Sequence, residues 1–491
     1  MKYLSKSNYI IGLKCLRHLW LAFNEPDKIP EPDAALQHRF EQGHTIGKLA
    51  QTLFPGGVNA QLPNQFLESI EHTKKLLAQR EILYEPAIVA SRLYARADIL
   101  VPVNEDEWDI VEVKSSTQIK EDHLHDLSFQ KYCYTNAGLK IRKCFLMHIN
   151  NEYVKNGEIE PEKLLVSEDV TSGVEEASNG IKERIELMLN VVERKTSPSV
   201  KDERCCKGPG HCEIDCWHFL PDNSVFHLHR VGEKAFELFE TGVLNIKDIP
   251  ETYELTEKQA IQRACEKTGK PHIEKENIKK FLAKLKYPLC FLDFETYATA
   301  IPLYDGLRPY QNIPFQFSLH ILEKENGEPK HISYLAGGAE DPRKEFAEKL
   351  KAGLPESGSI IVYYKSFEQK MIGELAELFP KYESWAESTI KRMVDLIVPF
   401  TEFYYYDSEQ QGSASLKVVL PALTGKSYKG LDIGEGETAS LSYLYITHSM
   451  DGKKATPEEV KKIRKDLEIY CGQDTEGMIW ILVELRKLAG L

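Results

Sequence analysis

The sequence predicts an α/β protein with more than one domain. The chain has 491 residues, enough for two or three domains with cores of their own. Strand-like segments alternate with helical segments in both the first and the last part of the chain, which favours sheets covered by helices. A long amphipathic helix is expected at the C-terminal end. Thr456, Pro457 and Glu459 provide its cap, a first-turn proline and a capping-box acid.

Composition narrows the class of protein further. The net charge of −13 argues against a protein that coats nucleic acid by bulk electrostatics, although a local basic groove is compatible with it. No run of residues approaches the ~20 apolar positions of a membrane-spanning helix. The N-terminal residues 1–23 lack the pattern of a signal peptide. We therefore expect a cytoplasmic protein that does not enter a membrane.

Glycine and proline breaks divide the chain into three parts. Residues 1–221 mix helix and strand patterns, and residues 222–285 contain helical segments separated by turns. Residues 286–491 open on the apolar run YPLCFLDFETYA and then alternate strands with helices. We therefore expect two α/β domains, 1–221 and 286–491, joined by a helical connector over 222–285.

The first group of candidate site residues lies in a predicted β-hairpin over 91–117. Apolar strands flank the acidic turn sequence NEDE. Asp98 is expected near the middle of the first strand, with Glu112 and Lys114 on one face of the second. Two carboxylates and a lysine on one face suit a hard divalent cation, which prefers oxygen ligands. The alternative is an exposed strand face that carries a Glu–Lys ion pair.

Two helical segments support the cation-binding interpretation. Gln130 and Tyr134 are four positions apart, which places them on one face of a helix. His44 lies in another helical segment, and an imidazole is a competent metal ligand.

A cysteine cluster closes the first part of the chain. Four of the ten cysteines lie within twelve residues, at Cys205, Cys206, Cys212 and Cys216. In a chain of this length, clustered cysteines are more often metal ligands or redox groups than disulfide staples.

The motifs of residues 1–221, in their order along the chain, resemble the RecB-type branch of the PD-(D/E)xK nucleases. Within that branch, the CRISPR-associated adaptation nucleases also carry an iron–sulfur cluster. The resemblance implies a restriction-endonuclease-like fold with Lys114 as a catalytic residue. It implies Mg²⁺ or Mn²⁺ bound by His44, Asp98 and Glu112.

The resemblance also implies nucleic-acid contacts. Gln130 and Tyr134 would touch DNA or support the site. Arg17 is a further candidate, because channels for single strands combine positive charge with stacking surfaces.

The same resemblance implies a 4Fe–4S cluster, held by one early and three late cysteines. The matching residues are Cys15, Cys206, Cys212 and Cys216. The spacing departs from the family, since five residues separate Cys206 from Cys212 and three separate Cys212 from Cys216. Cys205 could replace Cys206. The alternative is a structural Zn²⁺ site with His211 or His218 as a ligand. A third interpretation is that the cysteines are reactive redox groups.

The second group of candidate site residues lies in the last part of the chain. Asp293 and Glu295 are two apart on an apolar strand and so share one face. Buried acids of this kind need a partner, and a metal ion supplies one. Glu368 follows a later strand, and Tyr470 and Asp474 are four apart on the predicted long helix.

This arrangement over 286–491 resembles the tyrosine subclass of the DEDD exonucleases, which have a ribonuclease-H-like fold. The resemblance implies that Asp293, Glu295, Glu368 and Asp474 bind two Mg²⁺ or Mn²⁺ ions and that Tyr470 orients the attacking water. The family usually has Asp where this chain has Glu368. Asp395 is a reserve ligand, with a structural role at a strand end as the alternative.

The two resemblances together predict a nuclease with two phosphodiesterase sites, acting on DNA in repair or defence. RNA remains open as the substrate. The alternative is a nucleic-acid-binding scaffold in which only one site cleaves.

Overall fold

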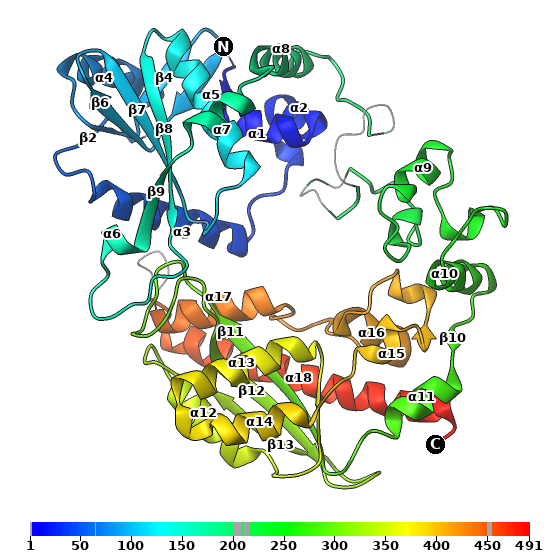
Figure 1. Cartoon of the computed structure of the whole chain (residues 1–491). Helices are drawn as coiled ribbons and strands as arrows, with labels where there is room; N and C mark the ends of the chain where they lie inside the picture. Colours follow the sequence, from blue (N-terminus) through cyan, green and yellow to red (C-terminus); the bar gives the residue numbers. More distant parts are fainter. Residues whose placement is uncertain (1, 64, 201–207, 211–213, 215, 449–453) are drawn as a thin grey trace. The chain divides into compact units, whose positions relative to one another are not determined.

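The computed structural model describes residues 2–63, 65–200, 208–210, 214, 216–448 and 454–491. The chain forms two compact units (Figure 1). The first contains Met1–His218 and Thr299–Gln311, and the second contains Phe219–Ala298 and Asn312–Leu491. Each unit combines a mixed β-sheet with covering helices, as the sequence predicts.

A six-stranded sheet forms the centre of the first unit. Its order is β2-β3-β6-β7-β8-β9, and the strands are Val58–Asn59, Leu83–Tyr84, Ile99–Val103, Glu107–Lys114, Lys140–Ile149 and Leu165–Asp169. Strands β6 and β7 are antiparallel, whereas β7 and β8 are parallel. The parallel pair needs a crossover, which helix α5 (Glu121–Asn136) provides.

Helices cover both faces of this sheet. On one face, Ile110 of β7 packs in a core that includes Tyr9 of α1 (Lys6–Lys14) and Phe129 of α5. On the other face, Val111 packs against Ile46 of α3 (Ala34–Gln51). Because strand side chains alternate, Glu112 and Lys114 lie on the side of α1 and α5.

The predicted hairpin is present, but its first strand is interrupted. Strand β5 (Leu93–Arg96) pairs with β1 (Leu4–Ser5) and β4 (Ala87–Ala90) in a separate three-stranded sheet. The chain then passes into β6 of the large sheet, which starts at Ile99. Asp98 therefore lies between two strands rather than in the middle of one. The alternation of apolar residues continues through this break, so the sequence pattern conceals it.

A five-stranded sheet forms the centre of the second unit. Its order is β13-β12-β11-β14-β15, and the strands are Lys330–Leu335, Ile313–Leu322, Leu289–Tyr297, Ser359–Val362 and Met393–Asp395. Strand β11 is central, antiparallel to β12 and parallel to β14.

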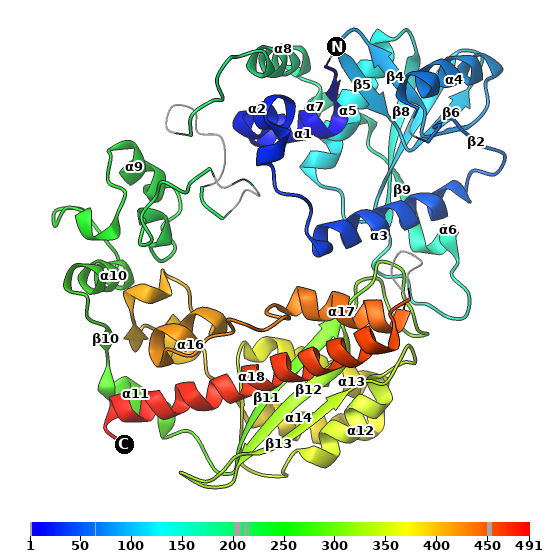
Figure 2. The same cartoon turned by 180° about the vertical axis from the view of Figure 1, so that it is seen from behind.

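Alternation along β11 sends its side chains to two different cores. Leu292 and Phe294 pack with α12 (Arg343–Gly353), α13 (Lys365–Leu378) and α14 (Glu383–Lys391). Leu289 and Phe291 face the side covered by α18 (Pro457–Ala489). Figures 1 and 2 show these two helical layers on opposite faces of the sheet.

The long C-terminal helix begins as the sequence predicts. Thr456 caps α18 and forms a capping box with Glu459, and Pro457 is in the first turn. The helix is fixed to β12 by polar contacts, since Gln316 Nε2 donates to the Leu467 carbonyl at 2.8 Å.

Residues 222–285 lie within the second unit. They contain α9 (Lys234–Glu240), α10 (Glu257–Thr268) and α11 (Lys275–Leu282), together with the short strand β10 (His272–Ile273). Among the described residues, no helix combines the length and the apolar character needed to cross a bilayer.

Candidate active sites

Site 1 is the group formed by Lys6, Asp98, Glu112, Lys114 and Asp126. Its residues come from α1, the β5–β6 junction, β7 and α5. The β6–β7 register pairs Ile99 with Val111, which sets Asp98 beside Glu112 at the end of the hairpin. Asp98 Oδ2 accepts a hydrogen bond of 2.6 Å from the Val113 amide. Asp98, Glu112 and Lys114 therefore lie close together, as the sequence predicts.

Two lysines neutralise the acids of site 1. Lys114 Nζ lies 2.7 Å from Glu112 Oε1 and 2.5 Å from Asp126 Oδ2. Lys6 Nζ lies 2.8 Å from the same Glu112 oxygen and 3.9 Å from Asp126 Oδ1. Glu112 is only 1% exposed, so its charge depends on these partners.

The protonation of site 1 follows from this pairing. Burial and the Asp98 carboxylate act to raise the pKa of Glu112, but Lys114 and Lys6 outweigh them and leave it below its ordinary value. Burial acts to lower the pKa of Lys114, yet the Glu112 and Asp126 carboxylates raise it overall. For Asp98, burial raises the pKa despite both lysines. Glu112 and Lys114 therefore stay charged at neutral pH.

Gln130 supports site 1 from α5. Its side chain is fully buried, and Nε2 donates to Glu112 Oε2 at 2.7 Å and to Asp126 Oδ1 at 3.0 Å. A buried amide held in this way presents no surface to nucleic acid, so its role here is to position the acids. Asp126 was not predicted, although its spacing of four from Gln130 on the same helix is a signal that could have identified it.

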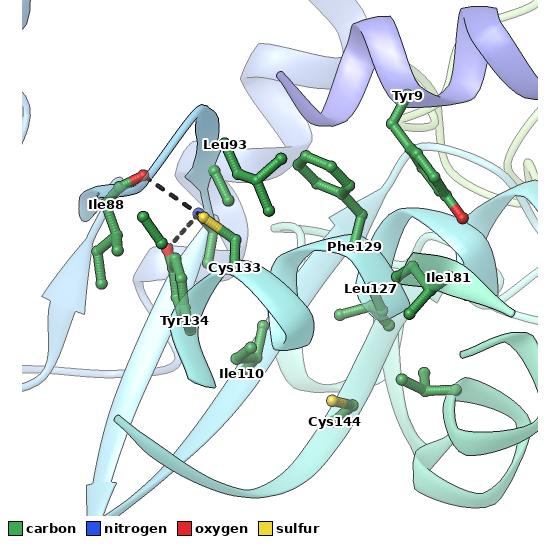
Figure 3. Close-up of a cluster of buried hydrophobic side chains, with 14 of the residues drawn as sticks. Tyr9, Ile88, Leu93, Ile110, Leu127, Phe129, Cys133, Tyr134, Cys144 and Ile181 are labelled. Carbon is green, nitrogen blue, oxygen red and sulfur yellow. Dashed lines mark hydrogen bonds between the residues drawn. The ribbon is translucent and has the colours of Figure 1, made fainter. Parts of the chain in front are cut away.

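Tyr134 is also buried, which corrects its assignment as a nucleic-acid contact. Figure 3 shows it within the core, near Cys133 and Ile110. Its hydroxyl donates to the Pro86 carbonyl at 2.8 Å and accepts from the Ala97 amide at 2.9 Å. The side chain has no exposed surface on which a base could stack. It fixes the backbone just before Asp98 and so has the supporting role that the resemblance also allowed.

The supporting role of Tyr134 predicts a loss of stability without a loss of nucleic-acid affinity. Tyr134→Phe leaves a buried amide and a buried carbonyl without their partner, which costs about 1–3 kcal/mol of unfolding free energy. Thermal unfolding of the first unit should show this loss. The control is Tyr132→Phe, since the Tyr132 hydroxyl makes no hydrogen bond within the described part of the chain. Weakened binding of nucleic acid at unchanged stability would contradict this role.

Two other predicted residues lie apart from site 1. His44 is exposed on α3, the helix that covers the opposite face of the sheet, and forms no hydrogen bond or ion pair with Asp98 or Glu112 in the described chain. The Arg17 guanidinium donates to Ser197 Oγ at 2.9 Å and to the Pro198 carbonyl at 3.0 Å. Arg17 therefore links α2 (Leu16–Asn24) to the end of the first unit.

The predicted cysteine ligands are described in part. Cys15 is 4% exposed and is the N-cap of α2, where its Sγ accepts a hydrogen bond of 3.3 Å from the His18 amide. A helix N-terminus favours a thiolate. Cys216 is also buried. His218, the alternative zinc ligand, is described and exposed. Four candidates lie outside the described residues, namely Cys205, Cys206, His211 and Cys212.

Site 2 is the group formed by Asp293, Glu295, Glu368, Tyr470 and Asp474. The acids of β11 point to the side of the sheet that α18 covers, where Tyr470 and Asp474 share one helix face. Strands β11 and β14 are parallel, so their carboxyl ends meet at one edge, and Glu368 follows β14 in the first turn of α13. Glu295, Glu368 and Asp474 are buried, with exposed fractions of 7%, 2% and 6%.

Asp395 has a structural role next to site 2. Its carboxylate accepts hydrogen bonds from the amides of Tyr364 at 3.2 Å, Lys365 at 2.9 Å and Ile397 at 3.1 Å. Tyr364 has φ +67°, which is costly for a residue with a side chain. The Asp395 carboxylate stabilises this turn and the start of α13. Asp395 thereby fixes the helix that carries Glu368, in agreement with the structural alternative.

Burial raises the pKa of every acid of site 2, and repulsion between neighbouring acids adds to this for Asp293 and Glu295. Burial raises the pKa of Asp293 well above its ordinary value, and the Asp474, Glu295 and Glu368 carboxylates raise it further. Burial and Asp474 do the same for the pKa of Glu295. Burial raises the pKa of Glu368 to about 8. The pKa of Asp474 rises only to about 6, because burial is opposed by a hydrogen bond from Tyr428 and the charge of Lys417.

These shifts predict that stability falls as pH rises when no metal is bound. Glu368 takes up its proton near pH 8 in the folded chain and near its ordinary value of 4.5 when unfolded. The native state therefore binds more protons between these values, and unfolding free energy declines across this window by at most about 5 kcal/mol. Chelator-treated protein should melt at a lower temperature near pH 8.5 than near pH 5.5.

Two controls make this prediction specific to site 2. Mn²⁺ should restore the melting temperature mainly at the higher pH, where the carboxylates are ionised. Glu368→Gln should reduce the pH dependence. A melting temperature that is flat across the window in the presence of chelator would contradict the shifts.

Three further residues complete the surroundings of site 2 and were not predicted. Tyr428 donates to Asp474 Oδ1 at 2.5 Å. Lys417 Nζ lies 5.2 Å from the Tyr470 ring centroid and 5.9 Å from that of Tyr428. Cys471 Sγ lies 3.6 Å from Asp293 Oδ2. Lys417 and Tyr428 come from the region before α18, and no local sequence pattern links them to the acids.

The donors of site 2 fit a divalent cation. One ligand atom each from Asp293, Glu295 and Cys471 lie within 4.8 Å of one another. Glu368 Oε2 is buried and has no hydrogen-bond partner in the described structure. A cation held by Asp293 and Glu295 would relieve the repulsion between these two acids, whereas Glu368 and Asp474 are not members of this 4.8 Å group. Within the described residues, this is the one cluster of three or more such ligand atoms, and site 1 pairs its acids with lysines instead.

Comparisons with known proteins match parts of the chain. Residues 290–415 match the model of a domain of unknown function, DUF2779. This region contains Asp293, Glu295 and Glu368 and ends before Tyr470 and Asp474.

Three curated relatives are uncharacterized proteins. The chain is 29% identical over 233 residues to protein UU173 of Ureaplasma parvum, which covers 42% of this chain and 32% of the relative. It is 25% identical over 218 residues to the MG366 homolog of Mycoplasma pneumoniae, and the match covers 40% of this chain and 32% of the relative. It is 25% identical over 226 residues to MG366 of Mycoplasma genitalium, covering 42% and 33%. The chain thus matches about a third of the length of each relative. The region similar to DUF2779 carries three of the four acids of site 2.

Proposed function

We propose that this protein is a divalent-metal-dependent nuclease with site 2 as an exonuclease centre of the DEDD type. The observation that carries the proposal is a group of four neighbouring carboxylates, three of them buried, with Glu368 Oε2 left without a partner in the described chain. Such an arrangement is costly for a structural core. It suits a cation-dependent phosphodiesterase. The central position of β11 in a mixed five-stranded sheet supports the ribonuclease-H-like assignment of this unit.

The residues of site 2 have distinct roles in this proposal. Asp293, Glu295, Glu368 and Asp474 would hold Mg²⁺ or Mn²⁺. The bound ions would stabilise charge on the attacking and leaving oxygens. Tyr470 stays neutral, because burial and the nearby Asp474 carboxylate raise its pKa. Its hydroxyl can therefore donate or accept a hydrogen bond with the attacking water, which fixes the direction of attack on the phosphate.

We further propose that site 1 is a PD-(D/E)xK phosphodiesterase site. Asp98 and Glu112 would bind the cation. Lys114 would neutralise charge that develops on the phosphate. Gln130 Oε1 is buried and unpartnered in the described structure, while its nitrogen holds Glu112, so the amide can reorganise when a cation enters.

A specific observation favours a second candidate role for the first unit. Lys6 and Lys114 both contact Glu112, so a cation has to compete with two ammonium groups that already satisfy the acid. The first unit would then be a nucleic-acid-binding module, and site 2 would be the only nuclease centre.

The cysteines are proposed to hold a 4Fe–4S cluster, with Zn²⁺ as the alternative. Cys15 and Cys216 are both buried in the first unit. Protein purified without oxygen should be brown and contain iron and sulfide. Cys15→Ser should remove the colour and destabilise the first unit, because the early ligand closes a long loop. A colourless protein with stoichiometric Zn²⁺ would contradict the iron–sulfur assignment and leave the nuclease proposal intact.

The nuclease proposal is tested with end-labelled substrates. Single- and double-stranded DNA and RNA are incubated with the protein and Mg²⁺ or Mn²⁺. The expected result is metal-dependent release of mononucleotides from a free end, with DNA as the preferred substrate. A ribonuclease would degrade the RNA instead. Absence of cleavage of every substrate with either ion would overturn the proposal.

A further inference from the structure

The ammonium group of Lys417 lies near site 2 and has no role in the proposed function. Lys417 lies in the first turn of α16 (Leu416–Thr424). Its ammonium group rests against the rings of Tyr470 and Tyr428, at 5.2 Å and 5.9 Å from their centroids. In the described part of the chain, it forms no hydrogen bond or ion pair. Its three N–H donors are therefore available to a ligand.

The two tyrosines fix Lys417 beside the acids. Tyr428 is held by its 2.5 Å hydrogen bond to Asp474, and its ring lies 6.3 Å from that of Tyr470. The charge of Lys417 acts on both Glu295 and Asp474 and lowers the pKa of each against the effect of burial. The ammonium thus lies within electrostatic reach of two acids of site 2 without pairing directly with either.

The charges of the proposed reaction call for such a cation. Four ionised carboxylates and two divalent ions sum to zero, so they provide no net attraction for a phosphodiester anion. A lysine fixed next to them adds one positive charge, and an ammonium is a suitable partner for phosphate oxygens. The aromatic faces that hold it are weak partners, so a phosphate would not have to displace a strong ion pair.

We infer that Lys417 binds a phosphate of the nucleic-acid strand that enters site 2. The inference rests on the proposed function and names the residue that recognises the substrate anion there. The ligand class is a phosphodiester strand, either DNA or RNA. Comparing the affinities for oligodeoxythymidylate and oligouridylate distinguishes these two substrates. Lys417 acts on substrate binding, whereas the acids act on the metal ions.

The test compares Lys417→Gln with Lys426→Gln. Lys426 is a matched control, since its ammonium also rests on an aromatic residue of α18, 3.5 Å from the Trp480 ring centroid, and is exposed. Affinity is measured for both oligonucleotides with Ca²⁺ as the ion. Lys417→Gln should raise Kd by about ten- to a hundredfold and reduce the salt dependence of binding by about one ion. Lys417→Arg should retain most of the affinity. The control should behave like the wild-type protein.

Mn²⁺ binding and the melting temperature are measured on the same variants. Both should be preserved in Lys417→Gln. A lower affinity for the oligonucleotides would then reflect the loss of a phosphate contact and not a loss of folding. If the wild-type protein cleaves nucleic acid and Lys417→Gln binds and cleaves it equally well, the inference is overturned and the proposed function stands. If the wild-type protein neither binds nor cleaves any strand, the proposed function fails and the inference fails with it.

Discussion

Asp293→Asn is expected to reduce metal-dependent exonuclease activity by about 10³-fold or more. Asp293 lies on the central strand and interacts with all three other acids of site 2. Replacing it removes one of the proposed metal ligands and leaves the remaining carboxylates in place. Initial rates of mononucleotide release, measured with saturating Mn²⁺, check this expectation.

The loss of activity in Asp293→Asn should not be accompanied by a loss of stability. Without metal, burial and the neighbouring acids disfavour the charged form of Asp293, so a neutral amide at this position should leave the melting temperature unchanged or raise it. Asp432→Asn is the control, because Asp432 is exposed and pairs with Lys462 at the surface. A folded Asp293→Asn protein with wild-type activity would show that site 2 is not the nuclease centre.

Lys114→Ala is expected to have the second-largest effect, on cleavage at site 1. The substitution removes the ammonium that bridges Glu112 and Asp126, at 2.7 Å and 2.5 Å. Loss of a preorganised charge of this kind costs about 10²–10³-fold in rate. Products that Asp293→Asn still forms should disappear when Lys114→Ala is added.

Lys6 limits the structural damage in this variant. It keeps its 2.8 Å contact with Glu112, so the buried acid retains one lysine partner in addition to its hydrogen bond from Gln130. Lys143→Ala, which removes an exposed ion pair with Asp169, is the matched control. If Lys114→Ala is folded and every cleavage product is unchanged, the first unit is a binding module rather than a second nuclease.

Residues related by local geometry could be predicted from the sequence. Asp293 and Glu295 share a strand face, and Tyr470 and Asp474 share a helix face, because these periodicities depend only on secondary structure. The capped start of α18 was predictable for the same reason. The pairing of Asp98 with Glu112 followed from the hairpin register, although the position of Asp98 within a strand was wrong.

Residues brought together by tertiary folding could not be predicted. Lys6 is more than a hundred positions from Glu112, and the docking of α1 against α5 brings them into contact. Lys417 and Tyr428 reach site 2 from the segment before α18 for a similar reason. The interpretation of Tyr134 as a nucleic-acid contact was wrong. Its spacing from Gln130 predicts that the two residues share a helix face, but it does not predict that the core of the first unit buries that face.

The most direct test of the two-site proposal compares four proteins on the same end-labelled DNA and RNA substrates. They are the wild-type chain, Lys114→Ala, Asp293→Asn and the double variant, each assayed with Mg²⁺ and with Mn²⁺. Because distant sites act independently, each single variant should lose one class of product and keep the other, and the double variant should cleave nothing. Undiminished cleavage by the folded double variant would contradict the assignment of both sites.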